Sequence, residues 1–342
     1  IWMIDPGVTQ LLSRNQKDHL KSKNLNFSIP AVHYRLAVWF SECCDLGISP
    51  LILSKPIRAT KNMTDNTEQK EFWNDLKGDL WVELQTKIDP MLAVFDEKLL
   101  EVLDVQKGER ALEIGCGTGT TTLKMADRLG PNGSIHALDF SEPMIGRAKE
   151  RAVEASVDHA VFVETDAQEY EYPSEEFDLA YSRFGVMFFE DPVKAFSGIQ
   201  SAMKPGGRLA YICWSDKNNN PWIWEPAQVA KKFLELPKPP GEDEPGMFSM
   251  CREERIFEIL EKAGWSEIRV EAFNSLNSIG NDADEAAEFI SRMGPMSEPF
   301  SLAGAAIQQK TLEAMKSFLK EYESADGVQM GFGNWVVTAR KS

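Results

Sequence analysis

Residues 112–120, LEIGCGTGT, have the residue types and spacing best suited to chemistry in this chain. Gly115, Gly117 and Gly119 let the backbone turn sharply, and they let a ligand approach without obstruction by a β-carbon. The segment follows an apolar run and opens a helical pattern. Because open α/β sheets bind cofactors at such a turn, we expect a cofactor site at the carboxyl end of the first strand.

The glycine spacing distinguishes between two cofactor classes. A dinucleotide site favours G-x-G-x-x-G, but the third glycine position holds Thr120, and Glu113 precedes the first glycine by two residues. Asp139 ends the second expected strand, where a carboxylate can accept hydrogen bonds from both ribose hydroxyls in either class. The structural alternative is that Asp139 or Ser141 caps the next helix.

Side chains after the next strands extend this predicted site. Phe140 would cover one face of an adenine. Asp166, at the end of the third strand, can accept from an adenine amino group, and the backbone N–H of Ala167 can donate to a ring nitrogen.

Strand and helix patterns alternate from residue 110 to 214, which predicts an α/β fold with a parallel sheet covered on both faces. The expected strands are residues 110–116, 134–140, 160–165, 177–183, 208–214, 268–273 and 334–340. The expected helices are two within residues 66–104, then 121–129, 143–155, 193–203, 253–263, 284–293 and 302–322. Residues 215–247, rich in Pro, Asn and acidic side chains, are expected to be a long loop that acts as a lid.

Five segments resemble the class I S-adenosylmethionine-dependent methyltransferases, most closely the subgroup of ubiquinone/menaquinone C-methyltransferase-like enzymes. They are LEIGCGTG, HALDFSEPM, ETDAQ, FDLAYSRFGVMFF and MKPGGRL, in this order, and the resemblance covers about residues 70–215. It implies a Rossmann-like seven-stranded sheet of order 3-2-1-4-5-7-6, with residues 334–340 as an antiparallel last strand beside the fifth. It also implies S-adenosylmethionine as the cofactor. The implied cofactor-binding residues are Glu113, Gly115, Gly117, Thr118, Gly119, Asp139, Phe140, Met144, Asp166, Ala167 and Arg183. Arg183 stands where quinone-methylating relatives carry a serine, which argues against a quinone acceptor.

The acceptor pocket is expected over the carboxyl ends of the first and fourth strands. Aromatic side chains there suit a hydrophobic or planar acceptor, or a cationic one, although the same side chains can pack as core. The candidate substrate-binding residues are Trp73, Trp81, Arg183, Phe184, Met187, Phe188, Trp214 and Trp222. Arg183 can bind an acceptor carboxylate, or it can pair structurally with Asp178 or Glu190.

Methyl transfer from a sulfonium is an in-line displacement in which positioning and desolvation lower the barrier. The sequence offers no convincing general base, so the catalytic residue is left unknown. Of the four histidines, His136 within the second strand and His159 before the third are expected to be structural. Cys116 and Cys213 are expected to be packed thiols, and no grouping has metal-ligand spacing.

Composition limits the partners. The chain has 37 basic and 53 acidic residues, and its net charge of −16 argues against nucleic acid and anionic membranes. No apolar run of transmembrane length and no CxxC pair occur. We therefore predict a cytoplasmic enzyme acting on a small molecule, as a monomer or homodimer. The alternatives are a non-catalytic S-adenosylmethionine-binding accessory module and an NAD-dependent oxidoreductase, which Thr120 disfavours.

Charge also suggests a boundary. Residues 1–62 hold eight Lys/Arg and four Asp/Glu, whereas the remainder is strongly acidic and begins MTDNTEQKEFW, like the start of a bacterial protein. We expect residues 1–62 to be an extension, the alternative being an N-terminal arm or targeting segment, and residues 63–342 to be a single domain. Its expected parts are N-terminal helices (66–104), a cofactor-binding core (105–214), a lid (215–250) and a C-terminal part (251–342) with a helical insertion (283–323).

Overall fold

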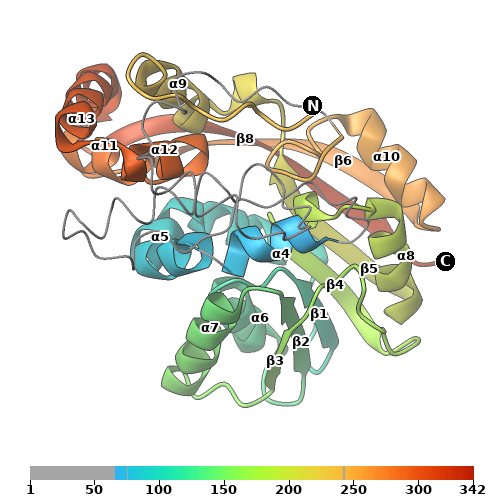
Figure 1. Ribbon diagram of the computed structural model, residues 1–342. Helices are drawn as coiled ribbons and strands as arrows, with labels where there is room; N and C mark the ends of the chain where they lie inside the picture. The colour runs from blue at the N-terminus through green and yellow to red at the C-terminus, as the bar shows by residue number, and fades with distance from the viewer. Residues whose placement is uncertain (1–65, 75, 242) are drawn as a thin grey trace, which may run out of the picture. The chain divides into compact units, whose positions relative to one another are not determined.

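The computed structural model describes residues 66–342 except residues 75 and 242, so the predictions for residues 1–62 lie outside the described residues. The fold is mixed α/β, and its sheet has the order β3-β2-β1-β4-β5-β8-β6 (Figure 1). β8 runs antiparallel to both of its neighbours, which confirms the expected strand order and the antiparallel last strand. The strands are β1 (Arg110–Ile114), β2 (Ser134–Asp139), β3 (Ala160–Glu164), β4 (Phe177–Arg183), β5 (Met203–Trp214), β6 (Ser266–Ser278), β7 (Glu323–Ser324) and β8 (Gly327–Arg340). The short β7 pairs with β8.

Helices cover both faces of this sheet. Their bounds are α4 (Thr67–Asn74), α5 (Leu76–Leu103), α6 (Thr120–Leu129), α7 (Glu142–Glu154), α8 (Pro192–Ala202), α9 (Pro221–Ala230), α10 (Glu253–Lys262), α11 (Ala283–Ser291), α12 (Ser297–Leu302) and α13 (Ala305–Leu319). Short 3-10 helices are η2 (Val186–Phe188), η3 (Lys217–Asn219), η4 (Gly294–Met296) and η5 (Lys320–Tyr322). Tyr211 of β5 contacts Phe196 of α8, whereas Trp214 contacts Phe95 of α5. Because positions 211 and 214 point to opposite sides of a strand, α5 and α8 lie on opposite faces.

The C-terminal strands are longer than their patterns predicted. Pairing between β5 and β8 ends at Trp214 and Asn334, but β6 and β8 stay paired for five more residues, up to Ser278 and Gln329. The two strands therefore extend as a ribbon beyond the carboxyl end of β5.

The predicted loop over residues 215–247 is wrong for η3 and α9. Pro221 occupies the first turn of α9, where its missing N–H costs nothing, and Ile223, Ala227 and Ala230 recur on one buried face. The predicted helix over residues 302–322 is confirmed from residue 305 onward, as α13 followed by η5. Ala303 and Gly304 have extended backbone angles and separate α12 from α13.

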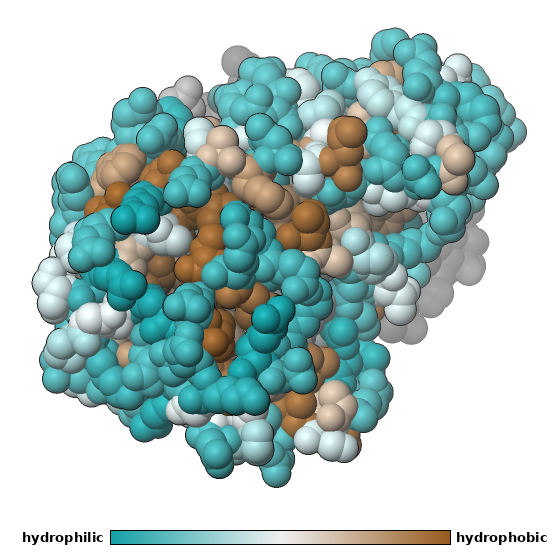
Figure 2. All heavy atoms as spheres, turned by 180° about the vertical axis from the view of Figure 1, so that it is seen from behind, coloured by the Kyte–Doolittle hydropathy of each residue, from teal (hydrophilic) through white to brown (hydrophobic). Residues whose placement is uncertain are grey.

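The face of the molecule opposite to the view of Figure 1 is mainly polar. Figure 2 shows the back of the molecule, where apolar side chains gather in one area of an otherwise largely hydrophilic face. Across residues 66–342, as far as they are described, no helix combines the length and apolarity needed to cross a bilayer.

Candidate active site

The glycine turn joins β1 to α6. The N–H groups of Gly115 and Cys116 both donate to the Leu138 carbonyl at the end of β2, at 2.8 and 3.0 Å. Gly115, Gly117 and Gly119 have φ of 70°, 54° and 81°, a left-handed region that is costly for other residues. A β-carbon on Gly117 would meet only the Met144 sulfur, at 3.8 Å. The turn therefore presents open backbone to a ligand.

Gly185, in the loop after β4, packs against the glycine turn. A β-carbon on Gly115 would lie 2.8 Å from Gly185 Cα, so the loops after β1 and β4 touch backbone to backbone. Ser182 joins the two loops, because its hydroxyl donates to the Ile114 carbonyl at 2.7 Å and accepts from the Gly185 N–H at 3.2 Å.

Asp139 braces the same turn. Its Oδ2 accepts from the Gly117 N–H at 2.8 Å, and its Oδ1 accepts from the Ser141 N–H at 2.9 Å. Burial raises the pKa of Asp139, and the backbone N–H groups of Ser141 and Gly117 oppose that shift. Neither side chain caps α7, since Ser141 is its N-cap residue and makes no side-chain cap bond. The capping alternative for Asp139 is therefore excluded.

Helix α4 lies over the ends of β2 and β3. Asn74 donates from Nδ2 to the Phe140 carbonyl at 2.6 Å and accepts at Oδ1 from the Glu142 N–H at 2.8 Å. Ser141 Oγ donates to the Trp73 carbonyl at 2.8 Å. The role of Asn74 is not visible in the sequence, because no spacing rule links it to residues 66 or more positions later.

Three of the predicted acceptor-binding side chains meet near the carboxyl ends of the strands. The rings of Trp73 and Trp81 are 5.6 Å apart, and those of Trp73 and Phe188 are 5.3 Å apart, both edge to face. We call Trp73, Trp81 and Phe188 the aromatic roof. It brings α4, α5 and the loop after β4 together.

Other predicted acceptor-binding residues belong to the core. Trp214 and Trp222 are only 5% and 3% exposed, and Trp222 stacks on Phe332 at 4.6 Å. Met187 is buried, and its sulfur accepts from the Trp214 N–H at 3.5 Å. Their burial favours the core-packing alternative, and their contact with an acceptor stays a prediction.

Phe184 belongs fully neither to the aromatic roof nor to the buried core. Its ring stacks on Trp214 at 4.0 Å, but the residue is only partly buried. Its φ of 61° is costly for a bulky side chain, and such outliers cluster at functional sites. Phe184 thus remains a candidate for acceptor contact.

Arg183 has a structural partner that was not predicted. Its Nη1 lies 2.7 Å from Oδ1 of Asp96 on α5, a fully buried carboxylate that Lys124 also approaches, at 3.2 Å. Burial raises the pKa of Asp96, and the two cations oppose that shift. Asp178 pairs instead with Lys204, at 2.6 Å. The structural partner of Arg183 is therefore Asp96, rather than Asp178 or Glu190 as the structural alternative proposed.

Glu113 points into the core. Its carboxylate accepts from Thr122 Oγ1 at 2.5 Å, from the Tyr181 hydroxyl at 2.8 Å, and from the Thr121 hydroxyl. Burial raises the pKa of Glu113, and these three hydroxyls oppose the shift. These bonds give Glu113 a structural role, since it holds the first turn of α6 next to the glycine turn. The contact with the cofactor that the resemblance implies stays a prediction.

A hydrogen-bond network around Arg151 stabilises the residues that follow the glycine turn. Arg151 of α7 donates from Nη1 to the Thr118 carbonyl and to Thr120 Oγ1, both at 2.9 Å, and from Nη2 to Asp89 Oδ2 at 2.9 Å. Thr120 Oγ1 in turn donates to Asp89 Oδ1 at 2.6 Å. Arg151 thus ties α5 and α7 to the predicted cofactor residue Thr118.

The two described histidines have structural partners. His136 Nε2 lies 2.9 Å from the Tyr170 hydroxyl, and His159 Nε2 lies 3.3 Å from the Ala126 carbonyl. Among residues 66–342, excluding 75 and 242, no group of three His, Cys, Asp or Glu is arranged to hold a metal ion.

The role of His136 leads to a prediction about pH. Burial lowers its pKa, so the folded protein favours the neutral ring while the unfolded chain takes up a proton as the pH falls. His136 therefore stabilises the folded state at pH values above the pKa of an ordinary histidine, and this stabilisation is lost as the pH falls. We expect wild type to lose more unfolding free energy than His136→Gln between about pH 7 and 5 in urea titrations. An equal loss in both proteins would contradict this assignment.

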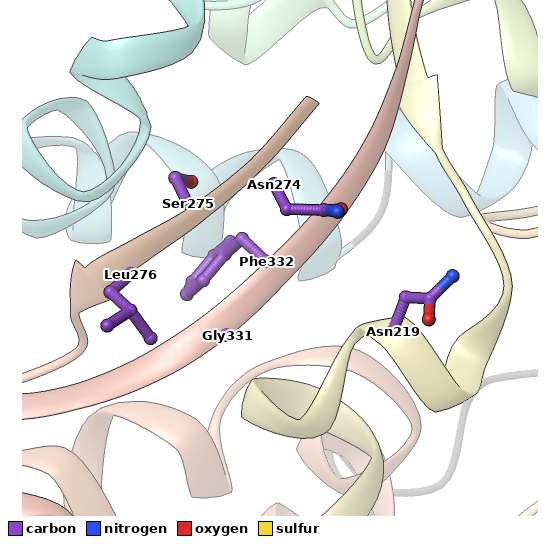
Figure 3. A pocket seen from close by; sticks show the side chains of 6 residues that line it. All are labelled: Asn219, Asn274, Ser275, Leu276, Gly331 and Phe332. Carbon is purple, nitrogen blue, oxygen red and sulfur yellow. The ribbon is translucent and has the colours of Figure 1, made fainter. Parts of the chain in front are cut away.

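A depression of about 330 Å³ lies on the β6–β8 ribbon. Figure 3 shows its lining from both strands and from Asn219 on the neighbouring η3. The lining residues are Asn219, Asn274, Ser275, Leu276, Gly331 and Phe332. The depression lies beyond Trp214 and Asn334, the last residue pair of β5 and β8. It is therefore distinct from the glycine turn.

Comparison with known proteins decides the family. Residues 105–268 match the model of a family described as "Methyltransferase domain". Residues 105–268 carry a methyltransferase domain, and the relatives support a class I S-adenosylmethionine-dependent methyltransferase. A demethylmenaquinone methyltransferase of Listeria monocytogenes is 29% identical over 168 residues, which are 47% of this chain and 68% of the relative. An aklanonic acid methyltransferase of a Streptomyces species is 31% identical over 114 residues, 33% of this chain and 52% of the relative.

A solved structure agrees with the methyltransferase fold. Phosphoethanolamine N-methyltransferase 2 of Haemonchus contortus superposes with a TM-score of 0.51 and 19% identity. The superposition covers 84% of this chain and 62% of that protein, so this chain spans less than two thirds of its length.

S-adenosylmethionine is the cofactor of this methyltransferase domain, and the residues present fit it. Gly117 leaves room beside the turn, Asp139 places a carboxylate next to it, and Asp166 follows β3 with a second carboxylate. Met144 lies beside Gly117, and Ala167 is buried next to Asp166. The contact of each residue with the cofactor remains a prediction.

Proposed function

We propose that this methyltransferase transfers the methyl group to a planar, largely apolar small molecule by in-line displacement. The aromatic roof carries this proposal, because Trp73, Trp81 and Phe188 form an apolar surface at the edge of the sheet that also holds the glycine turn. Aromatic faces and edges favour ring-shaped acceptors. Arg183, the nearby cation that could recognise an anionic acceptor, is paired with Asp96.

The bound cofactor supplies a methyl group already activated on a sulfonium. The residues of the chain then act mainly by positioning, which can lower a barrier by about 7–11 kcal/mol. The glycine turn and Asp139 hold the donor, while α4 and the aromatic roof hold the acceptor and exclude water. His136 and His159 are engaged structurally, which favours an acceptor atom that is already nucleophilic near neutral pH.

Two relatives support a small-molecule acceptor. Their names specify demethylmenaquinone and aklanonic acid, whereas the protein of the superposed structure is named for phosphoethanolamine. The net charge of −16 also favours a small molecule over nucleic acid.

The test uses S-adenosylmethionine with a deuterated methyl group. The protein is incubated separately with demethylmenaquinol, aklanonic acid and phosphoethanolamine, and the products are analysed by mass spectrometry. We expect label on at least one ring-shaped acceptor and none on phosphoethanolamine. Label on phosphoethanolamine alone would contradict the acceptor class. Binding of the cofactor without label on any acceptor in a wider metabolite extract would favour a non-catalytic module.

A further inference from the structure

Two amide oxygens at the start of α4 are buried and unpaired. Asn66, which immediately precedes the helix, is 3% exposed, and Gln69 lies one turn further along. In the described part of the chain, neither Asn66 Oδ1 nor Gln69 Oε1 has a hydrogen-bond partner. Because buried acceptors in proteins are nearly always paired, two unpaired ones on one short segment indicate a place suited to a hydrogen-bond donor.

The position of Asn66 indicates which donor. Its Nδ2 lies 3.5 Å from Oδ1 of Asp166, the carboxylate that follows β3. The opposite orientation of the amide would bring two oxygens together, so the orientation seen is the favourable one. Asp166 Oδ1 also accepts from the Gln168 N–H at 2.9 Å, which fixes the carboxylate in place. Asn66 and Asp166 therefore offer acceptors from two different elements at the end of β3.

Gln69 lies on the same side of the helix. Positions 66, 69 and 73 are three and seven residues apart, so they share one helical face. Trp73 on that face contributes to the aromatic roof, and its carbonyl accepts from Ser141 after β2. The face with the unpaired oxygens is thus the one that lies against the predicted cofactor site.

We propose that Asn66 recognises the adenine of S-adenosylmethionine. Its Oδ1 accepts a hydrogen bond from one hydrogen of the 6-amino group, while Asp166 accepts a hydrogen bond from the other. An exocyclic amino group has two hydrogens, and these two side chains provide the two acceptors. Gln69 provides a further acceptor on the same face for a donor of the adenosine. The inference rests on the proposed cofactor site, and it makes the N-terminal helix part of cofactor recognition.

The first experiment separates binding from folding. Asn66→Leu keeps the approximate size of the side chain and removes its polar atoms. We expect the Kd for S-adenosylhomocysteine, measured by isothermal titration calorimetry, to rise roughly fivefold to tenfold, the size of one lost hydrogen bond. The Tm of the free protein should change little, because the variant loses both an unpaired buried oxygen and the long 3.5 Å bond to Asp166. Lys70→Ala, an exposed position on the same helix, should change neither quantity.

The second experiment tests the base itself. Wild type should bind S-adenosylhomocysteine at least about tenfold more tightly than the analogue with a 6-oxo group, since the analogue leaves polar groups unpaired. Asn66→Leu should show a smaller ratio, whereas Gln69→Leu should keep the wild-type ratio. If Asn66→Leu does not fold, Asn66→Ala serves for the same two measurements.

The outcomes are distinguishable. An Asn66→Leu protein with a Kd within twofold of wild type and an unchanged ratio would show that water satisfies the oxygen, and the inference would be wrong. If folded wild type binds no S-adenosylhomocysteine, the proposed cofactor site itself is wrong, and the inference falls with it.

Discussion

Replacing Asp139 by alanine is expected to weaken S-adenosylhomocysteine binding by roughly 10–100-fold. The carboxylate braces the Gly117 and Ser141 N–H groups at 2.8 and 2.9 Å, and it is predicted to accept from the ribose. A hydrogen bond to a charged group contributes about 1.5–3 kcal/mol, and about 1.4 kcal/mol corresponds to tenfold in affinity. Isothermal titration calorimetry measures the change directly.

The matched control for Asp139 is another aspartate that has no role in the site. Asp158 has a side chain that is 98% exposed, so Asp158→Ala should bind as wild type does. The Asp139→Asn variant keeps the shape of the side chain but loses its charge, and we expect an intermediate Kd. Wild-type affinity in Asp139→Ala would refute the ribose assignment.

The second large effect is expected from Gly185→Ala. The φ of Gly185 is −88°, which alanine adopts readily, so the added methyl group acts only through space. It would lie 2.8 Å from the Ile114 carbonyl oxygen and 3.0 Å from Gly115 Cα. Because these neighbours are backbone atoms, the glycine turn must shift. Such overpacking costs about 1–3 kcal/mol. We expect a lower unfolding free energy in urea together with a higher Kd for S-adenosylhomocysteine.

Gly146→Ala provides the control for Gly185→Ala. Gly146 lies within α7, and a β-carbon there would meet nothing within 4 Å. Alanine should therefore stabilise the protein by about 0.5–1 kcal/mol and leave the Kd unchanged. If Gly185→Ala matches wild type in both stability and Kd, the close approach of the two loops is not required.

The fold could be predicted where its signals are local. The strands between residues 110 and 214 have apolar runs bounded by turns, and the glycine turn is a contiguous motif, so both are visible in the sequence. Helix α9 was missed because prolines at 221 and 226 and the preceding asparagines are typical of loops. Its buried face becomes meaningful only when β8 is packed against it, for example where Trp222 stacks on Phe332.

The site was predictable only in part, because several of its contacts join distant positions. Arg151 meets Asp89 across 62 residues, and Asn74 meets Phe140 across 66, and no sequence pattern marks such pairs. The aromatic candidates show the same limit. Trp73 and Trp222 both occur in helical segments, and only packing places the first in the roof and the second in the core.

The placement of α4 has a consequence for the kinetics of the reaction. Its bonds from Asn74 to Phe140 and from Ser141 to Trp73 join α4 to the loop after β2 that would hold the donor. We expect the donor to enter before these bonds form. The same docking completes the surface of Trp73 and Phe188 that would receive the acceptor. We therefore expect a compulsory order, with the methyl donor binding first and the demethylated donor leaving last. Initial-rate patterns should show product inhibition by S-adenosylhomocysteine that is competitive with the donor and noncompetitive with the acceptor.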